Sequence, residues 1–180
     1  MNWEIDSTHS HMSFAIRVLS VSTTRGRFHA LRGHLSIDEQ NPANSWVEAE
    51  VDAASIDTHN KLRDAHLRSA AFFAVKQYPT ITFQSTHVEH VDGQGYKVIG
   101  NLSMHGVTKP VTFDVEYRGQ STLTGVRTGL TAKATINRND FGLGQGAAVQ
   151  LAASSIATIE IDLEAVQQAV EVREAVATAQ

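Results

Sequence analysis

The stretch VTFDVEYR, residues 111–118, alternates apolar and polar side chains without a break. Such alternation is typical of a β-strand that buries one face and exposes the other. The same period of two recurs in seven other stretches, at residues 14–19, 28–37, 46–52, 80–84, 98–104, 130–136 and 158–163. The sequence therefore predicts an all-β protein of about eight strands.

Turn-forming residues separate these stretches, at Asn41-Pro42, Asp92-Gly93, His105-Gly106 and Gly125. No longer sequence period recurs, which excludes a repeat array. Strands of this kind must hide one face, and a sandwich or a closed barrel would do so. We favour an antiparallel barrel because closure also removes exposed sheet edges.

One internal segment departs from the strand pattern. Residues 60–77 are rich in Ala, Leu, Arg and Lys, and they lie between a possible cap at Asp57-Thr58 and the stop signal Tyr78-Pro79. We expect a short helical insertion there. Its apolar stripe would consist of Leu62, His66 and Phe73.

The C-terminal run, residues 164–179, also has a helix-like pattern, but only Val and Ala form its apolar side. A docked helix, a dimer contact and a fraying end are all open interpretations. The expected organisation is a barrel over residues 1–164 and a helical or frayed tail over 165–180.

The amino-acid composition restricts the classes of protein to which this chain can belong. The 180 residues are 42% hydrophobic and 19% charged, which suits one globular domain. A formal net charge of −4 argues against a surface for nucleic acid or anionic membranes. The absence of cysteine excludes disulfides, thiolate metal sites and cysteine nucleophiles.

The N-terminal residues 1–6, MNWEID, lack the basic and apolar regions of a secretion signal. No stretch approaches the ~20 apolar residues of a membrane span. We therefore expect a cytoplasmic protein that has no membrane span and no nucleic-acid partner.

The inward faces of the expected strands mix large and small residues. The large ones are Phe14, Phe83 and Phe113, and the small ones are Ala49, Gly100, Ala132 and Ala134. An eight-stranded barrel has room for one small apolar ligand. Small residues can equally accommodate large neighbours in a filled interior. Periodicity alone leaves both interpretations open.

Short motifs follow one another along the chain. They are Trp3-x-x-Asp6-x-x-His9-Ser10 with Phe14, Gly26-x-Phe28, Ser55-Ile56-Asp57-Thr58, Arg63-Asp64-x-His66-Leu67 with Phe72-Phe73, Tyr78-Pro79-x-Ile81-x-Phe83, Gly100-x-Leu102, Gly106-Val107-Thr108-Lys109-Pro110-Val111 and Asn137-Arg138-x-Asp140-Phe141-Gly142. In this order they resemble the YceI-like family of polyisoprenoid-binding, lipocalin-like barrels. The resemblance extends from Trp3 to about Leu163.

This resemblance implies an extended eight-stranded lipocalin-like barrel with a helix over one end and a long apolar pore. It implies that the pore holds an isoprenoid-type lipid, such as a polyprenyl phosphate or a prenylated quinone, and that the protein is a homodimer. The lipid is the expected ligand, and no catalytic residue, metal or cofactor is expected. The expected ligand-binding residues are Phe14, Ile16, Val18, Phe28, Val51, Arg63, His66, Phe72, Phe73, Ile81, Phe83, Leu102, Phe113, Ala132, Ala134 and Phe141.

Two features depart from the family pattern. The first strand of the family usually carries a histidine where this chain has Val18 or Leu19, which puts a head-group role at that position in doubt. Many members are periplasmic and carry a leader, whereas the N-terminal residues 1–6 lead us to expect none here.

The sequence contains nine histidines, a residue type that commonly binds metal ions, so a metal site has to be considered. His9 and His11 would share one face of a strand, but a third ligand is not identified, so we expect surface histidines instead. Asp6, His9 and Ser10 superficially suggest a hydrolytic triad. No nucleophile elbow or glycine-rich oxyanion segment accompanies them. Ser10 is better explained as a hydrogen-bonding residue at the start of a strand.

Arg63, Asp64 and His66 form the best polar cluster. At a pore mouth, Arg63 or His66 could meet a phosphate or quinone oxygen through a charge-assisted hydrogen bond. For Asp64 we favour a structural role with backbone donors, whereas both roles stay open for Arg63 and His66. Arg138 and Asp140 are expected to stabilise the turn that follows them.

Three functions are consistent with the sequence. The main hypothesis is a lipid-binding protein that sequesters or transports an isoprenoid. The alternative is a metal-dependent or hydrolytic enzyme that acts on a small amphiphile, motivated by the histidine count. The third is a stress-associated scaffold whose barrel is filled by its own side chains.

Overall fold

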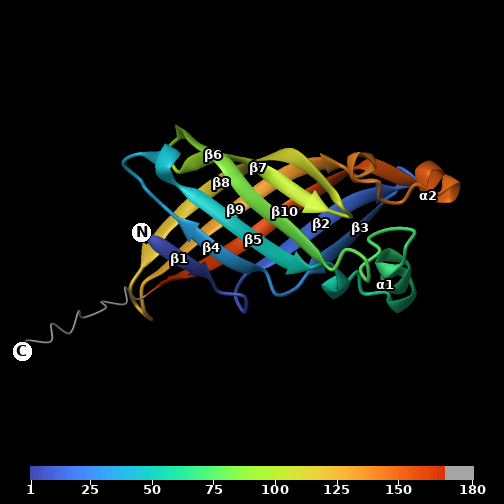
Figure 1. The fold of residues 1–180 in the computed structure, drawn as a ribbon, viewed down its shortest axis with the longest axis horizontal. Helices are drawn as coiled ribbons and strands as arrows, with labels where there is room; N and C mark the ends of the chain where they lie inside the picture. Colours follow the sequence, from blue (N-terminus) through green and yellow to red (C-terminus); the bar gives the residue numbers. More distant parts are fainter. Residues whose placement is uncertain (169–180) are drawn as a thin grey trace, which may run out of the picture.

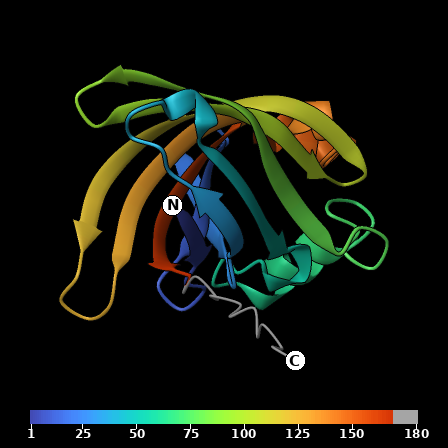
Figure 2. The same ribbon diagram turned by 60° about the vertical axis from the view of Figure 1, so that its left-hand side comes forward.

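The computed structural model of the chain describes residues 1–168, and ten strand segments dominate it (Figure 1). All neighbouring segments pair antiparallel and curve around one interior (Figure 2). The segments are β1 (Asn2–Ile5), β2 (His11–Val18), β3 (Ser22–Phe28), β4 (Arg32–Ser36), β5 (Trp46–Asp52), β6 (Thr80–Asp92), β7 (Gly95–Met104), β8 (Val107–Ser121), β9 (Arg127–Asn137) and β10 (Ala153–Gln167).

The ten segments amount to eight barrel strands because two strands are interrupted. One edge of β10 pairs with β9, and its other edge pairs first with β2 and then with β1. Likewise β3 pairs with β2, and β4 pairs with β1. Segments β1 and β2 therefore form one broken strand, and β3 and β4 form the next. The expected eight-stranded antiparallel barrel is confirmed.

The break between β1 and β2 is bridged by a serine hydroxyl. Ser10 is buried, and its hydroxyl donates to the backbone oxygen of Glu164 at 3.0 Å. The backbone N–H of Glu164 donates to the same hydroxyl at 2.9 Å. The Ser10 side chain thus takes the place of a backbone acceptor for the Glu164 N–H, while the Glu164 oxygen also accepts the Asp6 N–H at 2.8 Å. Its expected role as a hydrogen-bonding residue at a strand start agrees with this geometry.

The substitution Ser10→Ala tests this bridge. It leaves the half-buried Glu164 N–H without its hydroxyl partner, and we expect the free energy of unfolding to fall by about 1–3 kcal/mol. Urea denaturation measures the change. Ser13→Ala is the matched control, because the Ser13 hydroxyl makes one longer bond of 3.3 Å in an exposed setting. A loss no larger for Ser10→Ala than for Ser13→Ala would contradict the bridging role.

Two strand segments have no counterpart in the sequence-based expectation. Segment β3 begins with STTRGR, which has no apolar alternation, and it forms because it pairs with β2 along its whole length. Segment β1 lies in the polar N-terminus, yet its Trp3 is fully buried. The expected turns lie between strands, and the residues at the β7–β8 turn, His105 and Gly106, both have positive φ.

The helical insertion is shorter than expected. Helix α1 (Lys61–Arg68) begins at Asn60, whose side chain accepts the Arg63 N–H at 3.0 Å, and residues 69–79 form turns. The cap is therefore Asn60 and not Asp57-Thr58. The expected apolar stripe is wrong at Leu62, which is 86% exposed, because the buried side of the helix carries Asp64 instead.

The remaining helical segments lie between strands. A second helix, α2 (Ala147–Ala152), lies at the same end as α1 (Figure 1). Three short 3-10 turns connect strands, namely η1 (Pro42–Asn44), η2 (Ala53–Ser55) and η3 (Arg138–Phe141). Within residues 1–168, no helix combines the length and apolar character needed to cross a membrane.

The barrel extends beyond the expected boundary at residue 164. Strand β10 continues to Gln167, and Ala165 is fully buried opposite Ile5. The start of the expected tail therefore belongs to the barrel, since β10 needs this length to reach β1. Residues 169–180, on which the rest of that expectation falls, lie outside the described part of the chain.

Candidate functional site: a divided apolar cavity

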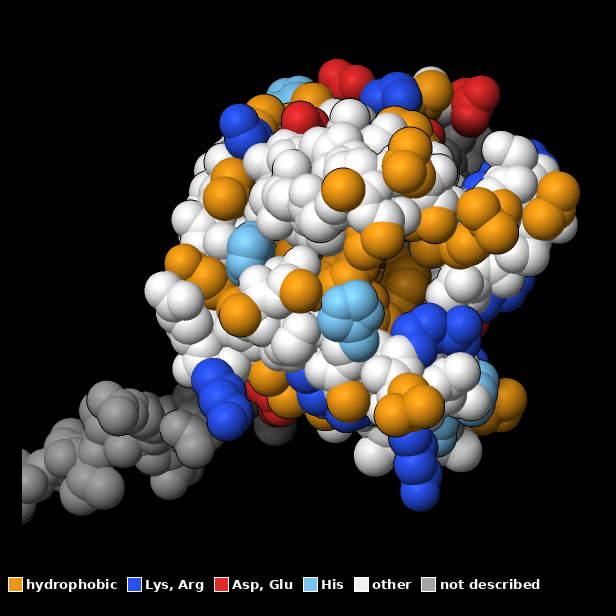
Figure 3. Space-filling view, turned by 90° about the vertical axis from the view of Figure 1, so that its right-hand side faces the viewer, with side chains coloured by type: hydrophobic (Ala, Val, Ile, Leu, Met, Phe, Trp, Pro, Cys, Tyr) orange, Lys and Arg blue, Asp and Glu red, His pale blue; other side chains and the backbone are white. Residues whose placement is uncertain are grey.

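Two apolar cavities lie inside the part of the barrel that residues 1–168 form. The larger has a volume of about 350 Å³ and lies at the end covered by α1 and α2. The smaller has a volume of about 120 Å³ and lies between β4, β5 and the strands β6 to β10. Figure 3 looks onto the α1–α2 end and shows a hollow whose depth is lined by apolar side chains.

A layer of buried side chains lies between the two cavities. On β9, Ala132 lines the smaller cavity and Ile136 lines the larger, while Ala134 between them lines neither. On β7, Leu102 occupies the same intermediate position and is 3% exposed. Because inward residues recur every second position on a strand, these residues fill the interior between the two cavities at β7 and β9. The interior is thus divided rather than one continuous pore.

Most of the expected ligand-binding residues line one of the two cavities. Nine line the larger cavity: Phe14, Ile16, Val18, Phe28, Arg63, His66, Phe72, Phe73 and Ile81. Three line the smaller cavity: Phe83, Phe113 and Ala132. The other four, Val51, Leu102, Ala134 and Phe141, are buried and line neither cavity.

Several lining residues were not expected from the sequence. Met12 and Met104 line the larger cavity and continue the inward period of β2 and β7, so alternation could have found them. Ala148 and Val149 line the same cavity from α2. A helix of six residues gives too short a pattern to be recognised in a sequence, so α2 carried no usable signal.

The small inward residues have two different roles. A Cβ added at Gly100 would lie 2.5 Å from the Phe83 ring, and one at Gly26 would lie 2.5 Å from the Phe14 ring. These glycines therefore make room for aromatic rings, as expected if small residues accommodate large neighbours in a filled interior. Ala49 instead lines the smaller cavity, as expected if small inward residues leave space for a ligand.

The polar residues at the mouth of the larger cavity are held by a chain of hydrogen bonds. Asp64 accepts bonds from the backbone N–H of Thr58 at 2.9 Å and from its hydroxyl at 2.5 Å. The Arg63 guanidinium donates to the Thr58 hydroxyl and to its backbone oxygen, both at 2.8 Å. His66 packs edge-on against Phe72 with ring centroids 5.1 Å apart. Asp64 thus orients Thr58, and Thr58 orients Arg63 beside the cavity.

Arg138 is a buried cation in the wall of the larger cavity. It is 4% exposed and donates to the backbone oxygens of Ser154, Leu143, Gly144 and Ala153. Burial lowers the pKa of its guanidinium. The bonds to residues 143 and 144 agree with the expected role in stabilising the turn after η3.

Comparisons with known proteins agree with this geometry. The model of the YceI-like domain matches residues 3–166. The chain belongs to the YceI-like family. A UPF0312 protein from Yersinia pestis is 38% identical over 140 residues, which cover 77% of this chain and 72% of that protein. A UPF0312 protein from Serratia proteamaculans is 39% identical over 137 residues, covering 75% and 71% of the two chains.

Solved structures share this YceI-like fold. The crystal structure of BcnA from Burkholderia cenocepacia matches with a TM-score of 0.82 at 22% identity, over 89% of this chain and 98% of that one. The YceI protein of Campylobacter jejuni matches with a TM-score of 0.75 at 27% identity, over 84% and 89%. A polyisoprenoid-binding domain from Saccharophagus degradans matches with a TM-score of 0.69 at 18% identity, over 92% and 98%.

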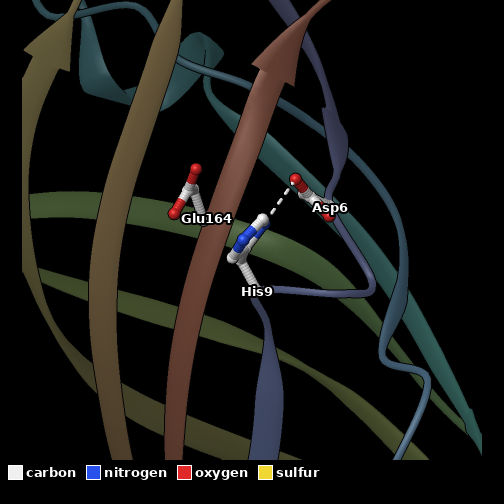
Figure 4. Close-up of side chains that lie close together, drawn as sticks. All are labelled: Asp6, His9 and Glu164. Atoms are coloured by element: carbon white, nitrogen blue, oxygen red, sulfur yellow. Dashed lines mark hydrogen bonds and ion pairs between the residues drawn. The ribbon is translucent and has the colours of Figure 1, made fainter. Parts of the chain in front are cut away.

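A second polar cluster of this YceI-like barrel lies where the end of β1, the turn before β2 and strand β10 meet (Figure 4). Asp6, His9 and Glu164 have potential ligand atoms within 4.8 Å of one another. Arg127 donates to Asp6 at 2.9 Å and also to the carboxylate of Glu164. Its guanidinium therefore supplies the positive charge that a metal ion would bring to these two carboxylates.

The same cluster contains the residues of the superficial hydrolytic triad. His9 Nδ1 lies 2.9 Å from Asp6, as a triad would require. The Ser10 hydroxyl, however, is bonded to the backbone of Glu164 and is buried. His9 lies in the turn before β2, so the expectation that it shares a strand face with His11 is wrong.

The ion pair of Asp6 makes the stability of the barrel depend on pH. Hydrogen bonds from Thr8, His9 and Arg127 hold the pKa of Asp6 well below its ordinary value of 3.8. A carboxyl group with a lower pKa in the folded state stabilises the fold fully above its unfolded pKa, and this contribution is lost as the pH falls. The Asp6 contribution therefore decreases below about pH 5 and continues to decrease below pH 3.8.

The substitution Asp6→Asn should lower the free energy of unfolding by about 2 kcal/mol at neutral pH, because it removes charged hydrogen-bond acceptors. The difference from wild type should shrink as the pH falls below about 5. Denaturant titrations at several pH values measure it. Asp114→Asn is the control, since Asp114 pairs with Lys97 in an exposed position. A pH-independent difference for Asp6→Asn would contradict the ion-pair explanation.

Proposed function

We propose that this protein binds an isoprenoid-type lipid, with the apolar chain in the larger cavity, and thereby sequesters or carries it. One observation carries the proposal: an apolar cavity that opens at one end of the barrel has basic side chains at its mouth. Among the similar structures, the Saccharophagus degradans domain is described as polyisoprenoid-binding, which supports the same class of ligand.

The cavity wall suits a hydrocarbon chain. Its lining from β2, α1 and α2 is almost wholly aliphatic or aromatic, and each buried CH₂ of a ligand contributes about 0.8 kcal/mol. A chain of several isoprene units therefore provides ample driving force. A long chain would have to cross the layer that contains Leu102 and Ala134, so a shorter or folded chain fits the larger cavity as it stands.

The mouth suits a polar head group that accepts hydrogen bonds. Arg63, His66 and Arg138 line the larger cavity, and Arg63 is already oriented by Thr58. A phosphate or quinone oxygen at this position would accept charge-assisted bonds from Arg63. In this proposal Arg63 supplies the head-group contact, since Val18 provides only apolar surface in the same cavity.

The homodimer and a role in stress belong to the same proposal and follow from the family resemblance. Light scattering of the purified full-length chain tests the dimer. A mass of one chain at micromolar concentration would remove the dimer from the proposal and leave the lipid ligand untouched.

Solvent extraction of the purified protein followed by mass spectrometry tests the ligand. We expect an isoprenoid-type lipid in reproducible proportion to protein, or saturable uptake of added polyprenyl phosphate or prenylated quinone by stripped protein. Reproducible absence of lipid together with no uptake of either compound would overturn the proposal.

Two matched substitutions identify the cavity that holds the chain. Ala157→Phe fills the larger cavity from β10, and Ala132→Phe fills the smaller one from β9. We expect Ala157→Phe to weaken binding of a short prenyl ligand at least about tenfold, because the displaced isoprene unit loses its buried area. Ala132→Phe should leave that binding within about twofold. Fluorescence competition measures both, and thermal unfolding confirms that each variant folds. The reverse order would place the ligand in the smaller cavity.

A further inference from the structure

Four large apolar side chains around the mouth of the larger cavity are exposed to solvent. Leu19 and Val21, in the β2–β3 turn, are 65% and 85% exposed. Leu62 on α1 is 86% exposed, and Leu151 on α2 is 88% exposed. These four residues are called the apolar rim. They come from the three elements that surround one opening, where Figure 3 shows apolar side chains around the hollow.

The β2–β3 turn holds its leucine in an unfavourable backbone conformation. Leu19 and Ser20 have φ angles of 53° and 58°, and the Val21 N–H donates to the Val18 oxygen at 3.2 Å. A tight turn with two left-handed residues favours Asn and Gly, because a bulky side chain clashes there. The Leu19 N–H also donates to the Ala152 oxygen at 2.7 Å, which ties the turn to α2. Strain at an exposed apolar residue points to a functional use of that residue.

The mouth is also the basic end of an acidic protein. The four segments that contribute the mouth, residues 17–25, 57–79, 104–109 and 138–156, carry eight Lys and Arg against three Asp. The remainder of the sequence carries seven Lys and Arg against 16 Asp and Glu. The net charge of −4 is therefore unevenly distributed, and the segments around the mouth carry a net positive charge. For this face, net charge alone does not describe the local charge, because folding brings basic segments together.

We propose that the apolar rim docks on the surface of an anionic phospholipid bilayer, with the mouth of the cavity facing the membrane. Exposed leucines beside basic side chains are the combination that binds at a charged membrane interface. A docked mouth would let an insoluble chain pass between bilayer and cavity without crossing water. Two copies that met mouth to mouth would oppose like charges, which disfavours a dimer through this face.

The idea that a lipid ligand passes through the docked mouth rests on the proposed function. Docking itself can be tested without any bound ligand. Co-sedimentation of the full-length chain with isoprenoid-free vesicles of phosphatidylcholine, with and without phosphatidylglycerol, measures docking alone. We expect stronger binding to the vesicles with phosphatidylglycerol, and weaker binding as salt is raised. Retained vesicle binding with no lipid uptake would overturn the proposed function and not the docking.

Substitutions in the rim separate docking from folding. Leu19→Asn removes the apolar side chain and places a residue that the turn favours, so the fold should be at least as stable. We expect Leu19→Asn and Leu151→Gln each to weaken vesicle binding about tenfold. Lys61→Gln, next to Leu62, should weaken it about fivefold. Neither leucine lines the cavity, so uptake of detergent-solubilised ligand should not change.

Two control substitutions lie away from the mouth. Leu123→Gln removes a leucine that is 94% exposed in the β8–β9 loop, and Lys133→Gln removes an exposed lysine on the barrel wall. Both should leave vesicle binding unchanged. Docking is overturned if wild type fails to bind anionic vesicles at low salt, or if the controls lose as much binding as the rim variants. It is also overturned if the rim variants change only self-association in light scattering, which would identify a second copy as the partner.

Discussion

The barrel depends on how the backbone N–H and C=O groups along the second edge of β10 find hydrogen-bond partners. One edge pairs with β9 over its length, but the other must be shared between β2 and β1. Unpaired backbone groups in a buried ladder are costly, so the gap between these partners needs a substitute. The Ser10 hydroxyl provides it by bonding Glu164 in both directions. Closure of the sheet, and with it the enclosed interior, relies on this junction.

Closure leaves an interior that the side chains fill only in part. The Phe83 and Phe113 rings meet edge to face at 5.1 Å beside the smaller cavity, and Gly100 makes room for the Phe83 ring. The filled layer near Leu102 then separates the two cavities. This barrel therefore has one spacious end and one tighter end, and the volume of each cavity is set by side-chain packing rather than by the strand pattern.

The two ends also differ in charge. Around the open mouth, basic side chains stand next to exposed leucines, whereas acidic residues dominate the rest of the sequence. Arg63 beside the cavity donates to neutral oxygens of Thr58, while Arg127 on the wall is paired with Asp6 and Glu164. One chain thus uses arginine to hold the sheet together in one place and to leave positive potential at a cavity in another.

The sequence by itself determined the strand pattern, the turns and the family, because alternation and turn chemistry act between neighbouring residues. It also indicated Phe14, Phe28 and Phe73 near the cavity. Only the tertiary structure decided that Ala132 lines a cavity while Ala134 does not, since that depends on the side chains which face them across the barrel. The bond between Ser10 and Glu164, the part of α2 in the wall and the basic mouth were decided in the same way. Each joins segments far apart in the chain, and no local pattern encodes their meeting.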